Sequence, residues 1–233
     1  MRLSIEPVAG IGEISPGDDF AGMLAAALAG LGPTDADIVV VTHKVVSKSE
    51  GAVVELADDG PDAHRRLVED EAVRIVRRRG NLVIAETRHG FICANAGIDR
   101  SNAAPGTAVL LPEDPDRSAR RLRDRLGAEL GVRPAVVITD TFGRPWRRGL
   151  VDVAIGVAGM SPITDLRGTT DSFGRVLDVT EVNLADEVAA AADLVMGKAT
   201  GICAALVRGV EFAASPGSVQ EDVIRPPEED LFR

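Results

Sequence analysis

Oxygen-rich side chains that suit a divalent cation gather at two places in the chain. Residues 95–102 carry Asp99 and two amides around a glycine, and Asp140 and Thr141 directly follow an apolar run. Mg²⁺ and Mn²⁺ prefer carboxylate, hydroxyl and amide oxygens, and parallel sheets bind ligands where their strands end. The two segments therefore predict a metal site, with ordinary turn capping by the same side chains as the alternative.

Three arginines and the only tryptophan follow in residues 143–149. On a chain of net charge -10, Arg144, Arg147 and Arg148 form a local anion site, because guanidinium groups match carboxylate and phosphate oxygens. Trp146 adds a ring face. We expect these arginines to hold an anionic substrate. The alternative is a structural network in which they pair with Asp165, Asp171 and Asp178.

Lys48 and His43 are candidates for nucleotide contacts. Lys48 follows an apolar run and would place a compact charge on a phosphate, with a solvated loop lysine as the alternative. His43, in an expected strand, is either a ligand contact or a packed core residue. The chain lacks the G-x-x-x-x-G-K-[ST] spacing of a P-loop. Its separated histidines and its two cysteines, Cys93 and Cys203, favour neither zinc nor a cysteine nucleophile.

Strands and helices must position these side chains. Apolar runs rich in β-branched residues predict strands at residues 38–46, 82–85, 107–111, 135–139, 151–157 and 202–207, with 53–59 and 175–180 as further hairpin strands.

Apolar spacing and capping patterns predict four helices. Asp114 precedes Pro115, and Asn183 lies three residues before Asp186, as at helix N-termini. The predicted helices are residues 18–31, 61–79, 115–130 and 183–197.

The mixture of elements indicates the fold class. Strands and helices do not alternate with the regular spacing of a doubly wound sheet, so we expect an α/β (α+β) fold with mixed sheets and packed helices. No repeat or Pro/Gly-rich linker divides the 233 residues. We therefore expect one catalytic unit over residues 1–233, built as one lobe or two.

Composition excludes several classes of protein. With 45% hydrophobic and 27% charged residues the chain is globular, and its net charge of -10 argues against a nucleic-acid binder. No apolar stretch approaches the ~20 residues that span a bilayer, and the start MRLSIEPVAG lacks a signal-peptide pattern. With only two cysteines, a cytoplasmic location without membrane contact is expected.

Three segments carry a resemblance to a known family. They are VTHKVVSKSEG, ETRHGFICANAGIDRSN and VVITDTFGRPWRRGLVDVAIGVAG. In this order the chain resembles the coenzyme F420:L-glutamate ligase family over nearly its whole length. The resemblance implies the non-P-loop amide ligase fold of that family and a homodimer whose active-site groove involves both subunits.

The resemblance also implies a reaction. GTP, with Mg²⁺ or Mn²⁺ and with K⁺ as a candidate further ion, would drive the addition of L-glutamate to the carboxylate of the deazaflavin precursor, followed by γ-linked glutamates. We expect an acyl-phosphate intermediate, with Asp140, Arg144, Arg147 and Arg148 as catalytic residues. By resemblance the first metal falls on Asp99 and Asp140, and the second on Thr141. The GTP contacts fall on Ile11, Gly12, Glu13, Ile14, His43, Lys48, Asn102, Met196, Gly197, Lys198, Ala199, Thr200 and Gly201.

One position departs from the family pattern. Archaeal members have a metal-binding glutamate where this chain has Lys198, and a cation there repels a metal. Either the second ion binds more weakly or Lys198 contacts phosphate. We expect no C-terminal nitroreductase-like domain. The alternatives to a ligase are a deazaflavin or nucleotide binding module without ligase chemistry and a metal-dependent phosphohydrolase.

Overall fold

The computed structural model describes residues 2–58, 60–101 and 103–231. Within these ranges a central sheet of five strands has the order β1-β12-β2-β8-β9, in which only β2 and β8 are parallel. The predicted α/β fold with a mixed sheet is confirmed. The strands are β1 (Ser4–Pro7), β12 (Ala204–Arg208), β2 (Ile38–Thr42), β8 (Ala135–Gly143) and β9 (Leu150–Ala158).

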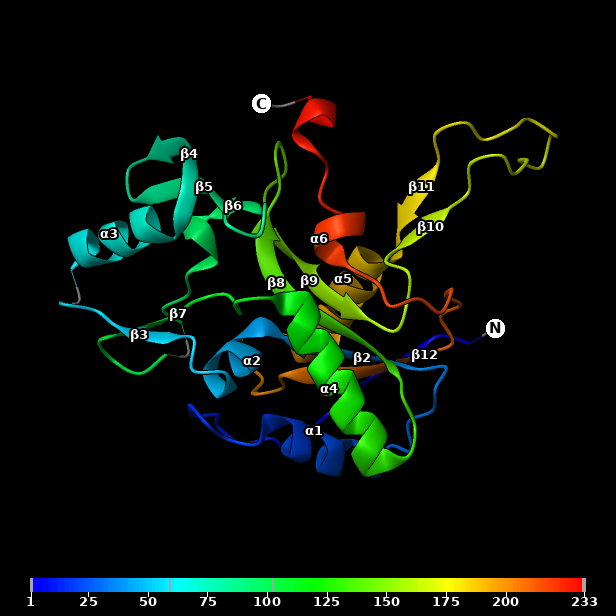
Figure 1. The fold of residues 1–233 in the computed structure, drawn as a ribbon, viewed down its shortest axis with the longest axis horizontal. Coiled ribbons are helices and arrows are strands. Elements are labelled where there is room, and N and C mark those ends of the chain that lie inside the picture. The colour runs from blue at the N-terminus through cyan, green and yellow to red at the C-terminus, as the bar shows by residue number, and fades with distance from the viewer. Residues whose placement is uncertain (1, 59, 102, 232–233) are drawn as a thin grey trace.

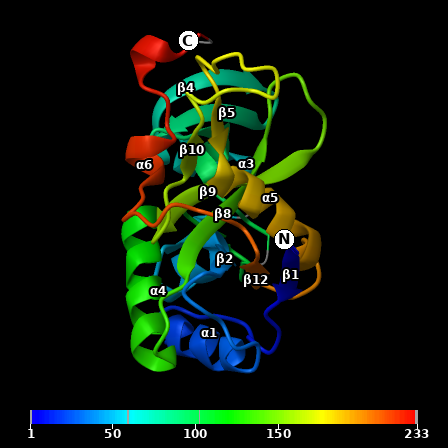
Figure 2. The same ribbon diagram turned by 90° about the vertical axis from the view of Figure 1, so that its right-hand side faces the viewer.

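Helices cover both faces of this sheet. Helices α1 (Phe20–Ala29) and α4 (Pro115–Leu130) pack on each other on one face, and α5 (Leu184–Met196) covers the other (Figures 1 and 2). The predicted caps form, since Asp114 accepts the amide of Arg117 and Asn183 accepts that of Asp186. The main core therefore lies between the sheet and these helices.

A smaller group of elements has its own apolar cluster, with Val68, Val83, Ala85 and Ala108 at its centre. It lies at the upper left of Figure 1. Its elements are β3 (Val53–Glu55) paired with β7 (Thr107–Val109), the antiparallel sheet β4 (Ala72–Arg79), β5 (Leu82–Thr87) and β6 (Ile92–Ala94), helix α3 (Pro61–Glu71) and a 3-10 turn at Asn95–Gly97.

The other elements lie outside these two groups. Strands β10 (Ile163–Asp165) and β11 (Glu181–Asn183) form the base of a long arm, visible at the upper right of Figure 1. Helix α2 (His43–Ser49) follows β2, and α6 (Val219–Asp222) and a 3-10 turn (Pro227–Glu229) lie near the C-terminus. In the part of the chain described, no helix is both long and apolar enough to cross a bilayer.

Several predicted segments differ from the structure. The strand predicted to residue 46 ends at Thr42, and the helix predicted to residue 79 ends at Glu71, where β4 begins because β5 supplies its backbone partners. Residues 175–180 form only one isolated bridge, Thr170–Val176. Strand β8 continues past residue 139 because β9 pairs with it as far as Gly143, so it is the parallel pairing with β2 that ends at Thr139.

Candidate functional site

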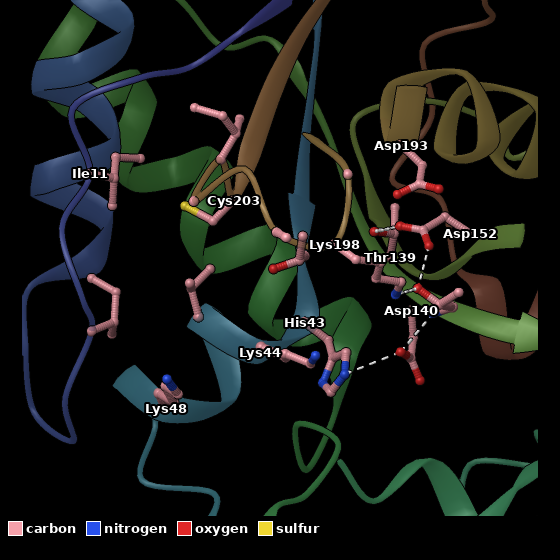
Figure 3. Close-up of a pocket in the computed structure, with 18 of the residues that line it drawn as sticks. Ile11, His43, Lys44, Lys48, Thr139, Asp140, Asp152, Asp193, Lys198 and Cys203 are labelled. Carbon is pink, nitrogen blue, oxygen red and sulfur yellow. Dashed lines mark hydrogen bonds and ion pairs between the residues drawn. The ribbon is translucent and has the colours of Figure 1, made fainter. Parts of the chain in front are cut away.

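A cavity lies at the carboxyl ends of the two parallel strands. Thr42 of β2 pairs with Thr139 of β8, and the residues that follow them, His43 and Asp140, line a cavity of about 370 Å³. The loop at residues 11–14, helix α2 and the loop after α5 complete its walls (Figure 3). The topology thus creates a ligand crevice at this edge.

His43 and Asp140 face each other in this crevice. Nε2 of His43 lies 3.2 Å from Oδ1 of Asp140, as the dashed line in Figure 3 shows. The contact has ion-pair distance without hydrogen-bond alignment, so Nε2 makes no hydrogen bond within the described ranges. His43 is 1% exposed and is the first residue of α2, not part of a strand as predicted. Because this buried nitrogen makes no hydrogen bond, it is available to a ligand, or to the Asp140 carboxylate once that side chain turns toward it.

The oxygen-rich segment that contains Asp99 contacts the first turn of helix α2. Nζ of Lys44 lies 2.6 Å from Oδ2 of Asp99 and donates to the hydroxyl of Ser101. Burial would raise the pKa of Asp99, but the hydrogen bonds from Lys44 and Ser101 outweigh it and hold the pKa below its usual value. Since His43 and Lys44 are consecutive, the chain brings the segments of Asp99 and Asp140 to one helix N-terminus.

Thr141 belongs to a polar corner that the sequence did not reveal. Its hydroxyl donates to Oδ1 of Asp152 at 2.5 Å, the Thr139 hydroxyl donates to Oδ2 at 3.0 Å, and Lys198 donates to Thr141. Burial, and then the charge of Asp152, raise the pKa of Asp193. A signal for Asp152 existed, because it is the one charged residue in the otherwise apolar strand β9.

Lys48 is part of the site rather than a solvated loop lysine, so that alternative is wrong. It lies in α2 and is 8% exposed, and its ammonium pairs with the carboxylate of Glu13. Ile11, Gly12, Glu13 and Ile14 all line the cavity, as the resemblance implied for a nucleotide site.

Part of the loop that follows α5 lines the cavity. Gly197, Lys198, Ala199 and Gly201 line the cavity, together with Ile202 and Cys203. Met196 is 1% exposed, and Thr200 donates its hydroxyl back to the Met196 carbonyl, so neither faces the cavity. Asn102 lies outside the described residues.

The three arginines lie apart from the cavity lining. Arg144, Arg147 and Arg148 are exposed in the turn between β8 and β9. The structural network does not form, because within the described ranges none of the three makes an ion pair and Asp165 pairs with Arg167 instead. Positive charge in this turn is therefore free for an external anion.

The cysteines are inert thiols. Burial, and then the charge of Asp140, raise the pKa of Cys93 to about 12, and burial raises the pKa of Cys203 to about 11. Neither forms a thiolate near neutral pH.

One carboxylate oxygen among the implied metal ligands is free for a hard cation. Oδ1 of Asp140 accepts the amide of Thr141 at 2.7 Å, whereas Oδ2 accepts no hydrogen bond from the residues described, although the side chain is only 13% exposed. The other two residues that the resemblance implies as metal ligands already contact ammonium groups. Lys44 pairs with Asp99, and Lys198 donates to the hydroxyl of Thr141. The described residues contain no cluster of three or more His, Cys, Asp or Glu suited to a metal. Water or substrate oxygens must therefore complete the coordination of any ion here.

Comparison with known proteins gives full-length similarity. The family model described as F420-0:Gamma-glutamyl ligase matches residues 10–209. The coenzyme F420:L-glutamate ligase of Methanothermobacter thermautotrophicus is 42% identical over 252 residues, covering 100% of both chains. The enzymes of the same name from Methanopyrus kandleri and Methanocaldococcus jannaschii are 43% and 42% identical, covering 99% and 85% of this chain and 98% and 85% of theirs.

Proposed function

The chain belongs to the F420-0:gamma-glutamyl ligase family and is an amide-forming ligase, and we propose that it joins L-glutamate to the deazaflavin coenzyme F420 precursor at the expense of GTP. The observation that carries this proposal is the meeting of His43 and Asp140 in the crevice, in a chain that matches such ligases along its whole length.

The cavity suits a nucleoside triphosphate. The ammonium groups of Lys44 and Lys48 on helix α2 and of Lys198 in the loop after α5 come from two of its walls and would neutralise phosphate oxygens. Each now contacts an oxygen of the chain itself, which a phosphate would replace. We assign GTP to this cavity.

Asp99 and Asp140 would hold Mg²⁺ or Mn²⁺, which when bound neutralises the charge that develops on the phosphates. His43 fixes Asp140 from the side opposite the free oxygen Oδ2. It is a positioning residue in this scheme.

The reaction activates a carboxylate. A carboxylate oxygen of the precursor forms a bond to the γ-phosphorus while the bond to the oxygen of GDP breaks, which gives an acyl phosphate. The neutral amine of L-glutamate then attacks the acyl carbon, and phosphate leaves with the electrons of the broken bond. One of the two amine protons passes to Asp140 or to the departing phosphate, and the other stays on the amide nitrogen. Further cycles on the side-chain carboxylate add γ-linked glutamates.

Arg144, Arg147 and Arg148 would hold the anionic precursor or the incoming glutamate. Their exposure, their freedom from ion pairs in the described chain and their position on the turn that β8 leads into support this role.

A homodimer and a cytoplasmic location complete the proposal. Exposed apolar side chains on the arm, with Phe173 89% and Val179 85% exposed, support a surface that a second copy of this chain covers.

The test is an incubation with GTP, Mg²⁺ or Mn²⁺, L-glutamate and the precursor, followed by mass spectrometry. We expect glutamyl additions that require every component and that Asp140→Asn abolishes. Asp124→Asn, on an exposed carboxylate paired with Arg133, is the matched control and keeps full activity. Nucleotide hydrolysis that ignores glutamate would indicate a phosphohydrolase. Binding of GTP and precursor without phosphate release would indicate a binding module.

A further inference from the structure

All three lysines of this chain line one cavity. The sequence holds 23 arginines and only three lysines, Lys44, Lys48 and Lys198, and each of the three lines the crevice at the ends of β2 and β8. Arginine supplies the positive charge elsewhere. Lysine is therefore used only in the cavity where phosphate charge has to be neutralised. A lysine ammonium is a compact charge, and in this respect it resembles a metal ion more closely than the planar guanidinium of arginine does.

Lys198 in particular lies where two carboxylates need a counter-charge. Both oxygens of Asp152 accept threonine hydroxyls, and Asp152 is 4% exposed. Asp193, Asp152 and Lys198 line the same cavity, and the charges of Asp152 and Lys198 shift the pKa of Asp193 in opposite directions. A buried carboxylate is costly without a nearby cation. The Lys198 ammonium, which donates to Thr141, is a cation close to this pair, and its charge lowers the pKa of Asp193 against the effect of burial.

The backbone fixes Lys198 in this place. It follows the last turn of α5, where the amide of Gly197 bonds to the Asp193 carbonyl and the Thr200 hydroxyl bonds to the Met196 carbonyl. The helix C-terminus carries partial negative charge, which also favours an ammonium there. Lys198 is therefore held in the corner by the fold.

We propose that the Lys198 ammonium is the resident cation of the corner formed by Thr141, Asp152 and Asp193, so that each active site binds one divalent ion, on the Asp140 side, and not two. This inference rests on the proposed function for the identity of the nucleotide. Its physical basis is like-charge repulsion: an ammonium on the Thr141 hydroxyl excludes a second divalent ion from that oxygen.

The test counts ions. Free Mn²⁺ is measured by electron paramagnetic resonance at saturating GTP, with a GTP-only solution subtracted. We expect one Mn²⁺ per chain in the wild type and in Lys198→Arg, and two in Lys198→Glu. Lys48→Glu makes the same charge change in the same cavity but away from Thr141, and we expect it to stay at one.

Two Mn²⁺ ions per chain in the wild type would overturn the inference. This measurement needs no variant, so it tests the inference even if a variant fails to fold. One ion in a folded Lys198→Glu, or two in Lys48→Glu, also overturns it, since the exclusion would then not be local to Lys198. The count is independent of turnover. Absent glutamyl transfer with one ion per chain defeats the proposed function alone, and active enzyme with two ions defeats this inference alone.

Discussion

The imidazole of His43 and the carboxylate of Asp140 lie 3.2 Å apart because each directly follows one residue of the pair Thr42 and Thr139, the last pair of the parallel ladder between β2 and β8. The register of two strands, almost a hundred residues apart in sequence, therefore sets the centre of the site. Any slip of that register would separate the two side chains.

His43→Gln should lower turnover roughly 10–100-fold, the usual cost of losing a group that orients a metal ligand. The reason is that Nε2 no longer restrains Asp140. Steady-state kinetics measure the effect, and Mn²⁺ affinity should weaken in parallel, which a purely structural role would not cause. His64→Gln, outside the cavity lining, is the control and should behave as wild type. Full turnover in His43→Gln would remove His43 from the mechanism.

Arg147→Ala and Arg148→Ala should raise the KM for the precursor or for glutamate about tenfold or more, since a hydrogen bond to a charged group contributes ~1.5–3 kcal/mol. Because both side chains are exposed, thermal stability should not change. The matched control is Arg167→Ala, an exposed arginine that pairs with Asp165. If both KM values stay at the wild-type level, the turn between β8 and β9 holds neither substrate.

Gly156→Ala should destabilise the fold by about 1–3 kcal/mol, as overpacking does. A Cβ on Gly156 of β9 would lie 2.4 Å from the backbone oxygen of Pro115, so the first turn of α4 would have to move. Gly143→Ala is the control in the neighbouring strand β8, since its Cβ meets nothing nearer than 3.9 Å. Urea unfolding of both variants measures the difference. Equal midpoints would show that α4 does not pack this closely on β9.

His89 should make stability depend on pH. Burial, and then the charge of Arg88, lower the pKa of His89 from 6.5, although hydrogen bonds to the carbonyls of Pro112 and Glu113 oppose the shift. Since the folded pKa is lowered, the stabilisation is complete above about 6.5 and is lost as the pH falls below that value. Urea midpoints between pH 7.5 and 5 should therefore fall less steeply in His89→Gln. Parallel curves for the two proteins would contradict this.

Local patterns predicted the elements that depend on local chemistry. The caps of α4 and α5 form where Asp114 and Asn183 indicated, and the apolar runs became β2, β8, β9 and β12. Partners distant in the sequence decided the rest. The run at residues 72–79 became a strand because β5 pairs with it, and residues 43–46 became a helix because the parallel ladder stops at Thr42.

The site was predictable in the same uneven way. Asp99, Asp140 and Lys48 carried signals of residue type and position, and Asp152 stood out as the one charged residue of β9, whereas Asp193 carried no signal. The part that Asp152 and Asp193 play in the site depends on which strand and which helix face the Thr141 hydroxyl. One local segment of sequence does not determine the register between two strands or the position of a helix on a sheet. Arg144, Arg147 and Arg148 follow Asp140 closely in sequence, yet the hairpin carries them out of the cavity lining.

A crystal structure with GTP and Mn²⁺, in which anomalous scattering locates the metal, tests whether the crevice between His43 and Asp140 is the active site. We expect a manganese peak at Oδ2 of Asp140, with the triphosphate in contact with the ammonium groups of the three lysines that line this cavity. Nucleotide and metal bound at another surface, with the crevice between His43 and Asp140 filled only by water, would contradict it.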